Sequence, residues 1–259
     1  MQLKMYQIDA FAKNVFEGNP AAVVPLEEWL DDALMQKIAM ENNLSETVFF
    51  VKEGVNYHIR WFTPIAEVDM CGHATLASAY VLFELLNYLN NEIVFDSKSG
   101  ELRVKKENGK FVMDFPAQEI STCQVPYAIS EAFEVKPKES YKSMDYLLIF
   151  ENEEDVLNAK PNLQKLKNID ARGVIITSKS KEYDFVCRFF APKIGVDEDP
   201  VTGAAFTQLV PYWSKVLGKE EFKAKQVSQR GGEVFCKLQG SRVEIAGYGL
   251  KYLEGVIEI

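Results

Sequence analysis

A glutamate at the start of a predicted strand is the residue of this chain best suited to proton-transfer chemistry. Glu46 lies in the segment Asn43-Leu44-Ser45-Glu46-Thr47, where a helical pattern gives way to a strand pattern. A carboxylate held there could take a proton from a bound molecule and return it. From the residues alone, an exposed turn glutamate is the commoner outcome for such a position.

His73 and Cys71 stand close together at the start of an apolar run that extends to Leu86. The imidazole could donate to a substrate anion or shuttle a proton, or it could bond within its own loop. The thiol could act as a base, although a small buried group is the commoner fate of a free cysteine. No group of His, Cys and Asp has metal-ligand spacing, so no metal site is predicted.

Two acidic loops lead into small residues and then into apolar helical patterns, at 69–74 and at 198–203. A helix N-terminus has unpaired backbone N–H groups and a partial positive charge. Small residues there allow a ligand to approach, so two such termini could bind a carboxylate. Ordinary capping by Asp69 and Asp199 explains the same pattern equally well.

The elements that would position these groups follow from hydrophobic periodicity. Helical spacing of Leu26, Leu30, Leu34 and Ile38 predicts a helix that starts at Pro25 and ends near Asn42. Buried helices are predicted at 72–86 and after 201–205, the latter with a kink or a restart at Pro211 and an end at Gly218. Strands are predicted at 2–10, 21–24, 47–51, 57–62, 92–96, 102–107 and 110–114, with loops at 63–69 and 195–200 and a connector at 116–127.

Composition narrows the classes of function. The 259 residues are 47% apolar and 26% charged, and the formal net charge of -9 disfavours binding to nucleic acid. The chain has no GxGxxG or GxxxxGK[ST] motif, so neither a dinucleotide nor an ATP site is predicted. It has four cysteines, none in a CxxC pair, and neither a signal peptide nor a membrane-spanning run is predicted. We therefore expect a cytoplasmic protein with reduced thiols and no membrane association.

Four segments of the chain carry a resemblance to a known family. They are Asp9-Ala10-Phe11 with Gly18-Asn19-Pro20-Ala21-Ala22-Val23-Val24, then Asn43-Leu44-Ser45-Glu46-Thr47, then Asp69-Met70-Cys71-Gly72-His73-Ala74-Thr75-Leu76-Ala77, and Glu198-Asp199-Pro200-Val201-Thr202-Gly203. In order and spacing they resemble the PhzF-like (phenazine biosynthesis-like) isomerase family, which belongs to the superfamily with the diaminopimelate epimerase fold. The resemblance runs nearly end to end, and Gln229-Arg230-Gly231-Gly232 is similar to the YddE-type branch.

The resemblance implies an α+β fold of two pseudo-symmetric domains, each a sheet wrapped around a central helix, at 1–115 and 116–259. In such a fold the last strand of the chain could pair with the sheet of the first half. The resemblance also implies a homodimeric biosynthetic isomerase without a cofactor, whose active site lies in the cleft between the halves. Phenazine-pathway members act on a dihydro-hydroxyanthranilate.

The resemblance implies roles for particular residues. Glu46 would move a proton between carbons of a small carboxylate substrate, assisted by His73 and Asp199. The groups expected to bind the substrate are Gly72, Ala74, Thr202, Gly203 and Gly231.

Three positions depart from the pattern of the family and its superfamily. Ala204 and Phe206 stand where the family usually has serine and histidine, which removes a hydroxyl and is expected to make the nearby surface less polar. Pro200 stands where related racemases have a second cysteine, so catalysis by two thiols is not expected. Two alternatives stay open: a racemase or epimerase that uses Cys71 with Glu46 or Asp199, and a non-catalytic protein that binds a small anion.

Overall fold

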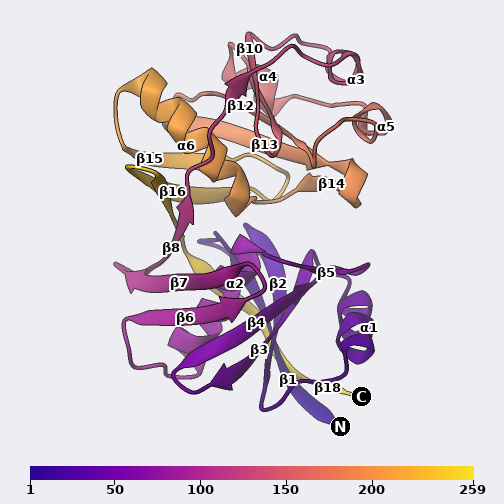
Figure 1. The fold of residues 1–259 in the computed structure, drawn as a ribbon, viewed down its shortest axis with the longest axis vertical. Coiled ribbons are helices and arrows are strands. Elements are labelled where there is room, and N and C mark those ends of the chain that lie inside the picture. The colour runs from indigo at the N-terminus through magenta and orange to yellow at the C-terminus, as the bar shows by residue number, and fades with distance from the viewer. The chain divides into compact units, whose positions relative to one another are not determined.

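The computed structural model describes residues 1–259, and the chain divides into two compact units (Figure 1). The first unit comprises Met1–Asp114 and Ala246–Ile259, and the second comprises Phe115–Ile245. The end of the chain belongs to the first unit because β18 (Gly249–Glu258) pairs antiparallel with β1 (Gln2–Ala10) along its length. The boundary predicted from the sequence lay between residues 115 and 116.

The first unit contains a mixed sheet in which β2 and β3 are parallel, as are β4 and β6, while the other neighbours run antiparallel. Its remaining strands and helices are β2 (Asn19–Leu26), α1 (Asp32–Asn42), β3 (Glu46–Glu53), β4 (Asn56–Phe62), β5 (Glu67–Val68), α2 (Gly72–Tyr80), the π-helical turn η1 (Val81–Leu85), β6 (Glu92–Ser97), β7 (Gly100–Glu107) and β8 (Lys110–Pro116).

Helix α2 is the central helix of this unit. Every residue from His73 to Ala79 is buried, and the helix packs against β1, β2, β3 and β18. An apolar sequence with no polar face is typical of a helix surrounded by a sheet. The helix predicted at 72–86 is confirmed as α2 followed by η1, but it is buried only as far as Leu82, and Glu84 and Leu86 are exposed.

The helix predicted to start at Pro25 starts seven residues later, which corrects that prediction. β2 continues through Pro25 and Leu26 because both pair with β3. The helix begins only where the Asp31 carboxylate accepts a hydrogen bond from the Ala33 N–H, at 2.9 Å. The spacing of leucines was therefore misleading at its first two positions, where strand pairing and a cap decide the structure.

The second unit repeats the order of the first. Its elements are β9 (Ser121–Thr122), α3 (Tyr127–Ser130), β10 (Glu139–Lys142), β11 (Tyr146–Ile149), α4 (Glu153–Leu157), α5 (Leu163–Leu166), β12 (Val174–Lys179), β13 (Phe185–Ala191), the 3₁₀ turn η2 (Pro192–Ile194), β14 (Val196–Asp199), α6 (Gly203–Leu217), β15 (Glu221–Gln226), β16 (Gly232–Gln239) and β17 (Arg242–Gly247).

Strand pairing shows the pseudo-symmetry directly. β10 and β11 are antiparallel, β11 and β12 parallel, β12 and β13 antiparallel, and β13 pairs antiparallel with β14 and parallel with β15. The first unit has the same succession from β1 to β6, and in each unit a buried helix follows the short strand, α2 after β5 and α6 after β14. The segment predicted as a loop at 195–200 therefore contains a strand, because Phe189 and Ala191 of β13 pair with it.

Helix α6 runs through Pro211 without interruption, so it does not restart there, which was one of the two predicted outcomes. Proline has no N–H and leaves the carbonyl four residues earlier without its helical partner. Here the Gln118 N–H donates to that carbonyl, on Thr207, at 2.9 Å. The helix ends at Gly218, whose φ of 65° provides the left-handed cap that was predicted.

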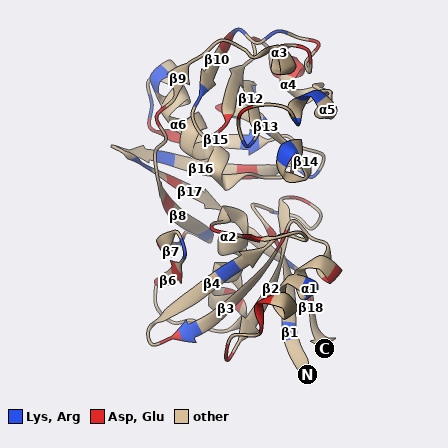
Figure 2. Cartoon of the chain, turned by 45° about the vertical axis from the view of Figure 1, so that its right-hand side comes forward, with Lys and Arg blue, Asp and Glu red and all other residues tan.

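Basic and acidic residues are interspersed along the elements of each unit (Figure 2). Exposed lysines and arginines lie beside acids at 2.6 to 2.8 Å, as in Arg103–Glu92, Lys106–Glu84 and Lys181–Glu154. Such surface pairs contribute little to stability but neutralise the cations locally. None of the helices has both the length and the apolar character needed to cross a bilayer.

Candidate active site

Glu46 and His73 meet in the first unit, although 27 positions separate them in the sequence. Glu46 is the first residue of β3 and pairs with Ala21 of β2. The turn before it is tied down, since Asn43 ends α1 with φ 48° and Asn42 donates to the Thr47 hydroxyl at 3.0 Å. His73 lies in the first turn of α2.

The two side chains form a buried, oppositely charged pair. His73 Nε2 lies 2.9 Å from Glu46 Oε2, with only 5% and 16% of the side chains exposed. Both atoms are buried, yet neither makes an aligned hydrogen bond. A buried polar atom without a hydrogen bond is costly, and such atoms concentrate where a ligand or a reaction uses them. The Glu46 oxygen is therefore a strong candidate for the reacting base.

The other ring nitrogen of His73 also has polar neighbours. Asn19 Nδ2 lies 3.2 Å from Nδ1, and Cys71 Sγ lies 3.4 Å from it. The Asn19 side chain is fully buried, and an amide can present either its nitrogen or its oxygen to a ring nitrogen. Asn19 therefore suits both protonation states of the imidazole, as a proton-transfer partner requires.

Electrostatics favour the charged form of His73. Burial acts to lower the pKa of the imidazole, but charge at Cys71 and Glu46 outweighs burial and holds that pKa well above its usual range. Burial, followed by the negative charge of Glu46, raises the pKa of the Cys71 thiol. After Cys71, Glu46 is the second source of negative charge that raises the His73 pKa, and its Oε2 lies 2.9 Å from Nε2.

Glu46, Cys71 and His73 are also the three residues whose ligand atoms lie close enough to suggest a metal site, within 4.8 Å of one another. The sulfur lies against Nδ1 and the carboxylate against Nε2. One imidazole nitrogen binds one ion, so an ion between His73 and Cys71 would lie on the side of the ring away from Glu46. The arrangement suits a proton pathway better than a metal centre.

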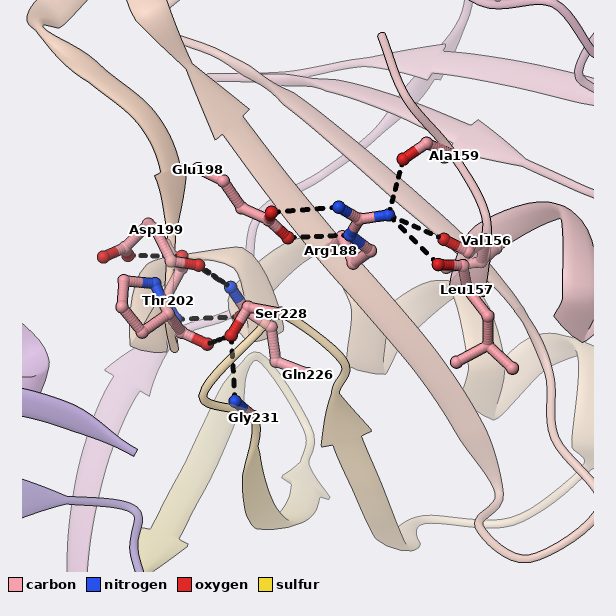
Figure 3. A network of polar contacts seen from close by, with 11 residues as sticks. Val156, Leu157, Ala159, Arg188, Glu198, Asp199, Thr202, Gln226, Ser228 and Gly231 are labelled. Atoms are coloured by element: carbon pink, nitrogen blue, oxygen red, sulfur yellow. Dashed lines mark hydrogen bonds and ion pairs between the residues drawn. The ribbon is translucent and has the colours of Figure 1, made fainter. Parts of the chain in front are cut away.

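In the second unit, Asp199 and Thr202 bracket the turn between β14 and α6 (Figure 3). We call residues 198–202 the acidic turn. The Thr202 hydroxyl donates to Asp199 Oδ2 at 2.5 Å, and the Gln226 side chain bonds both residues. At the start of the turn, Glu198 makes two hydrogen bonds to Arg188, at 2.7 and 2.9 Å.

The residues predicted to bind substrate lie at the two helix starts or in a nearby loop. Gly72 and Ala74 are in the first turn of α2, whereas Thr202 and Gly203 are at the start of α6. Gly231 has a φ of 67° and donates its N–H to Ser228 within its own loop, at 3.0 Å. Their contacts with a substrate stay predictions.

The expectation for Phe206 is wrong. Its side chain is fully buried and lies against Phe185, with ring centroids 6.2 Å apart, so it belongs to the core of the second unit and leaves the polarity of the surface unchanged. Ala204 is half-buried in the first turn of α6.

Sequence reasoning did not select three side chains that the structure places in these clusters. Asn19 lies within a quoted segment, Gly18-Asn19-Pro20, but nothing in the pattern linked it to His73. Gln226 and Ser228 are ordinary polar residues at a strand end and in a loop. A polar residue with no charge gives no signal in a single sequence, because its importance comes from its partners.

Comparison with known proteins now identifies the family. Residues 8–255 match the profile of the PhzC-PhzF family, described as phenazine biosynthesis-like protein. The chain belongs to this family. It is 48% identical over 260 residues to an uncharacterized isomerase of Pseudomonas aeruginosa, with all of both chains covered. It is similar to the crystal structure of a PhzF-family protein of Enterococcus faecalis, at 43% identity, a TM-score of 0.98 and full coverage of both chains.

More distant likeness extends to the fold. A hydroxyproline epimerase from Agrobacterium vitis superposes with a TM-score of 0.64 at 8% identity, covering 99% of this chain and 92% of the other. The predicted α+β architecture with epimerase-like halves is therefore confirmed. The PhzF-like chain is assigned to the isomerases by its relatives.

Proposed function

We propose that this PhzF-like isomerase moves a carbon-bound proton within a small carboxylate substrate, without a cofactor, and that Glu46 is its acid/base. The observation that carries the proposal is the buried Glu46 Oε2, which accepts no aligned hydrogen bond and lies 2.9 Å from His73 Nε2. His73 is the proposed partner of Glu46, and Asp199 is proposed to assist.

The proposed chemistry follows from the charges. Glu46 accepts a proton from a substrate carbon, and the electron pair of the broken C–H bond stays in the conjugated system of the substrate. The protonated His73 compensates negative charge while this happens. Glu46 then returns the proton to a different carbon, so the atoms of the substrate are conserved and only a proton and double bonds move.

A thiol base is the less favourable alternative. A base at Cys71 would have to be a thiolate, whereas burial and Glu46 raise the pKa of that thiol. The position corresponding to a second thiol holds Pro200, which cannot act as a base. The glutamate is therefore the better acceptor of a carbon-bound proton.

Deuterium uptake from heavy water tests the proposal. NMR would follow uptake into a panel of small unsaturated and amino carboxylates, including dihydro-hydroxyanthranilate, with wild type and Glu46→Gln side by side. General acid–base catalysis contributes roughly 10²- to 10⁴-fold, so uptake by wild type should fall by about that factor in the variant.

Each outcome has a distinct meaning. Equal uptake by both proteins would eliminate Glu46 as the base. Uptake by neither, over a panel wide enough to include the substrates of relatives, would argue against carbon-proton transfer. The identity of the substrate, a homodimeric assembly, a cytoplasmic location and a biosynthetic role stay predictions.

A further inference from the structure

The carboxamide of Gln226 is fully buried at the end of β15 and is bonded on both sides. Its oxygen accepts from the Thr202 N–H at 2.8 Å. Its nitrogen donates to the Asp199 carbonyl at 2.7 Å and to the Thr202 hydroxyl oxygen at 3.2 Å (Figure 3). One side chain therefore joins both ends of the turn that precedes α6.

These bonds set the direction of the hydroxyl of Thr202. Because the Gln226 nitrogen is a donor, the Thr202 oxygen acts as its acceptor, and the hydroxyl hydrogen is free to point at Asp199 Oδ2. The amide of Gln226 thereby selects the rotamer in which Thr202 supports the carboxylate of Asp199. A residue without a donor at this position would leave that rotamer unselected.

The same bonds decide which helix N–H groups remain available. The Thr202 N–H is occupied by Gln226, whereas the next two, on Gly203 and Ala204, have no partner within the helix. Thr202 therefore stabilises the turn through both its N–H, which donates to Gln226, and its hydroxyl, which donates to Asp199. Gly203, which is buried, and Ala204, which is half-buried, carry the N–H donors of the α6 start that have no partner within the helix.

Two further contacts hold the acidic turn. Ser228 donates to the Pro200 carbonyl at 2.8 Å and in turn accepts from the Gly231 N–H at 3.0 Å. Arg188 holds Glu198 through two hydrogen bonds and also donates to the Ala159 carbonyl at 2.7 Å. Gln226 is the one among these that contacts Asp199 itself.

We propose that Gln226 is a positioning residue, which fixes the carboxylate of Asp199 and the donors at the start of α6 for the reaction. The inference rests on the proposed function, in which Asp199 assists the proton transfer. Positioning of this kind is worth roughly 10- to 100-fold in rate when a supporting side chain is removed.

The first test needs no substrate. Amide hydrogen exchange, followed by NMR on the whole protein, would compare wild type with Gln226→Leu. In the variant the Thr202 N–H loses its acceptor, the Gln226 side-chain oxygen. Its exchange should therefore become about tenfold faster relative to that of the amides in the centre of β12. Unchanged protection of Thr202 would overturn the proposal.

Gln208→Leu is the matched control. Gln208 is a buried amide of the same unit and donates to Asp145 at 3.3 Å. Its loss should cost the protein comparable stability and leave the exchange of Thr202 unaltered. A similar acceleration in both variants would mean a general loosening of the unit, which would also overturn the proposal.

The second test uses a substrate found by deuterium uptake. Gln226→Leu should lower kcat by about 10- to 100-fold per folded molecule, with a smaller change in KM, while Gln208→Leu should keep wild-type kcat. Thr202→Ser, which retains the hydroxyl, should keep most of kcat, and Thr202→Val should lose it. Wild-type kcat in Gln226→Leu would sink the positioning role. Wild type that turns over no carboxylate would count against the proposed function alone, and the exchange measurement would still decide the local role of Gln226.

Discussion

Replacing Glu46 by glutamine should alter the stability of the protein by an amount that depends on pH. His73 Nε2 and Glu46 Oε2 are 2.9 Å apart, and both side chains are largely buried. Unit charges at that distance attract by about 6 kcal/mol at an effective dielectric constant near 20. The desolvation cost of burying two charges offsets much of this attraction. We therefore expect the variant to lose about 2 kcal/mol of unfolding free energy at a pH where both groups of the wild type are charged.

The sign of the pH dependence follows from His73. Its pKa in the folded protein is raised well above the usual value of 6.5. Its contribution to stability is therefore fully present below about pH 6.5 and is lost as the pH rises through the folded pKa. In Glu46→Gln the buried imidazole has lost its counter-ion, and burial then disfavours the charged form. The difference between the two proteins should be largest near about pH 6 and shrink as the solution becomes alkaline.

Urea unfolding followed by circular dichroism at about pH 6 and pH 8.5 measures both effects. If thermal unfolding is followed instead, a loss of about 2 kcal/mol in a chain of this size corresponds to a decrease of roughly 4 to 8 °C in Tm. Glu84→Gln is the control, because Glu84 also loses a cationic partner, Lys106 at 2.7 Å, but that pair lies at the surface and contains no histidine. A difference between wild type and Glu46→Gln that is constant or grows with pH would refute the reasoning.

Three further predictions concern other parts of the molecule. Arg172→Met should destabilise the second unit by about 3 to 5 kcal/mol in urea, because it leaves the fully buried Asp145 carboxylate without its cation; a loss below about 1 kcal/mol would contradict this. Cys71→Ser should reduce deuterium uptake less than about tenfold if the base is a carboxylate, whereas abolished uptake would assign the chemistry to the thiol. Gly18→Ala should cost about 1 to 3 kcal/mol more than the matched Gly54→Ala, since both have positive φ but only at Gly18 would the new methyl group lie 2.1 Å from a backbone carbonyl of β1; equal losses would show that the close contact relaxes.

Local pattern was a good guide wherever one element decides its own structure. The run that became α2 is apolar nearly all round, and it could be recognised together with the small residues before each buried helix because a helix buried on all sides has no polar face. Neighbours in the sheet overruled local pattern elsewhere. Leu26 and Leu30 matched a helical spacing, yet strand pairing extended β2 through Leu26 and the Asp31 cap delayed the helix.

The sequence by itself determined the family, the repeated order of elements and the residue types available for proton transfer. Tertiary structure alone decided the partners of those residues. Asn19 contacts His73 although 54 positions separate them, and Gln226 contacts Thr202 although 24 positions separate them. Strand pairing brings such residues together, whereas local periodicity does not encode these contacts. Burial then gives these contacts their strength, since an ion pair or an amide bond matters most where water is excluded.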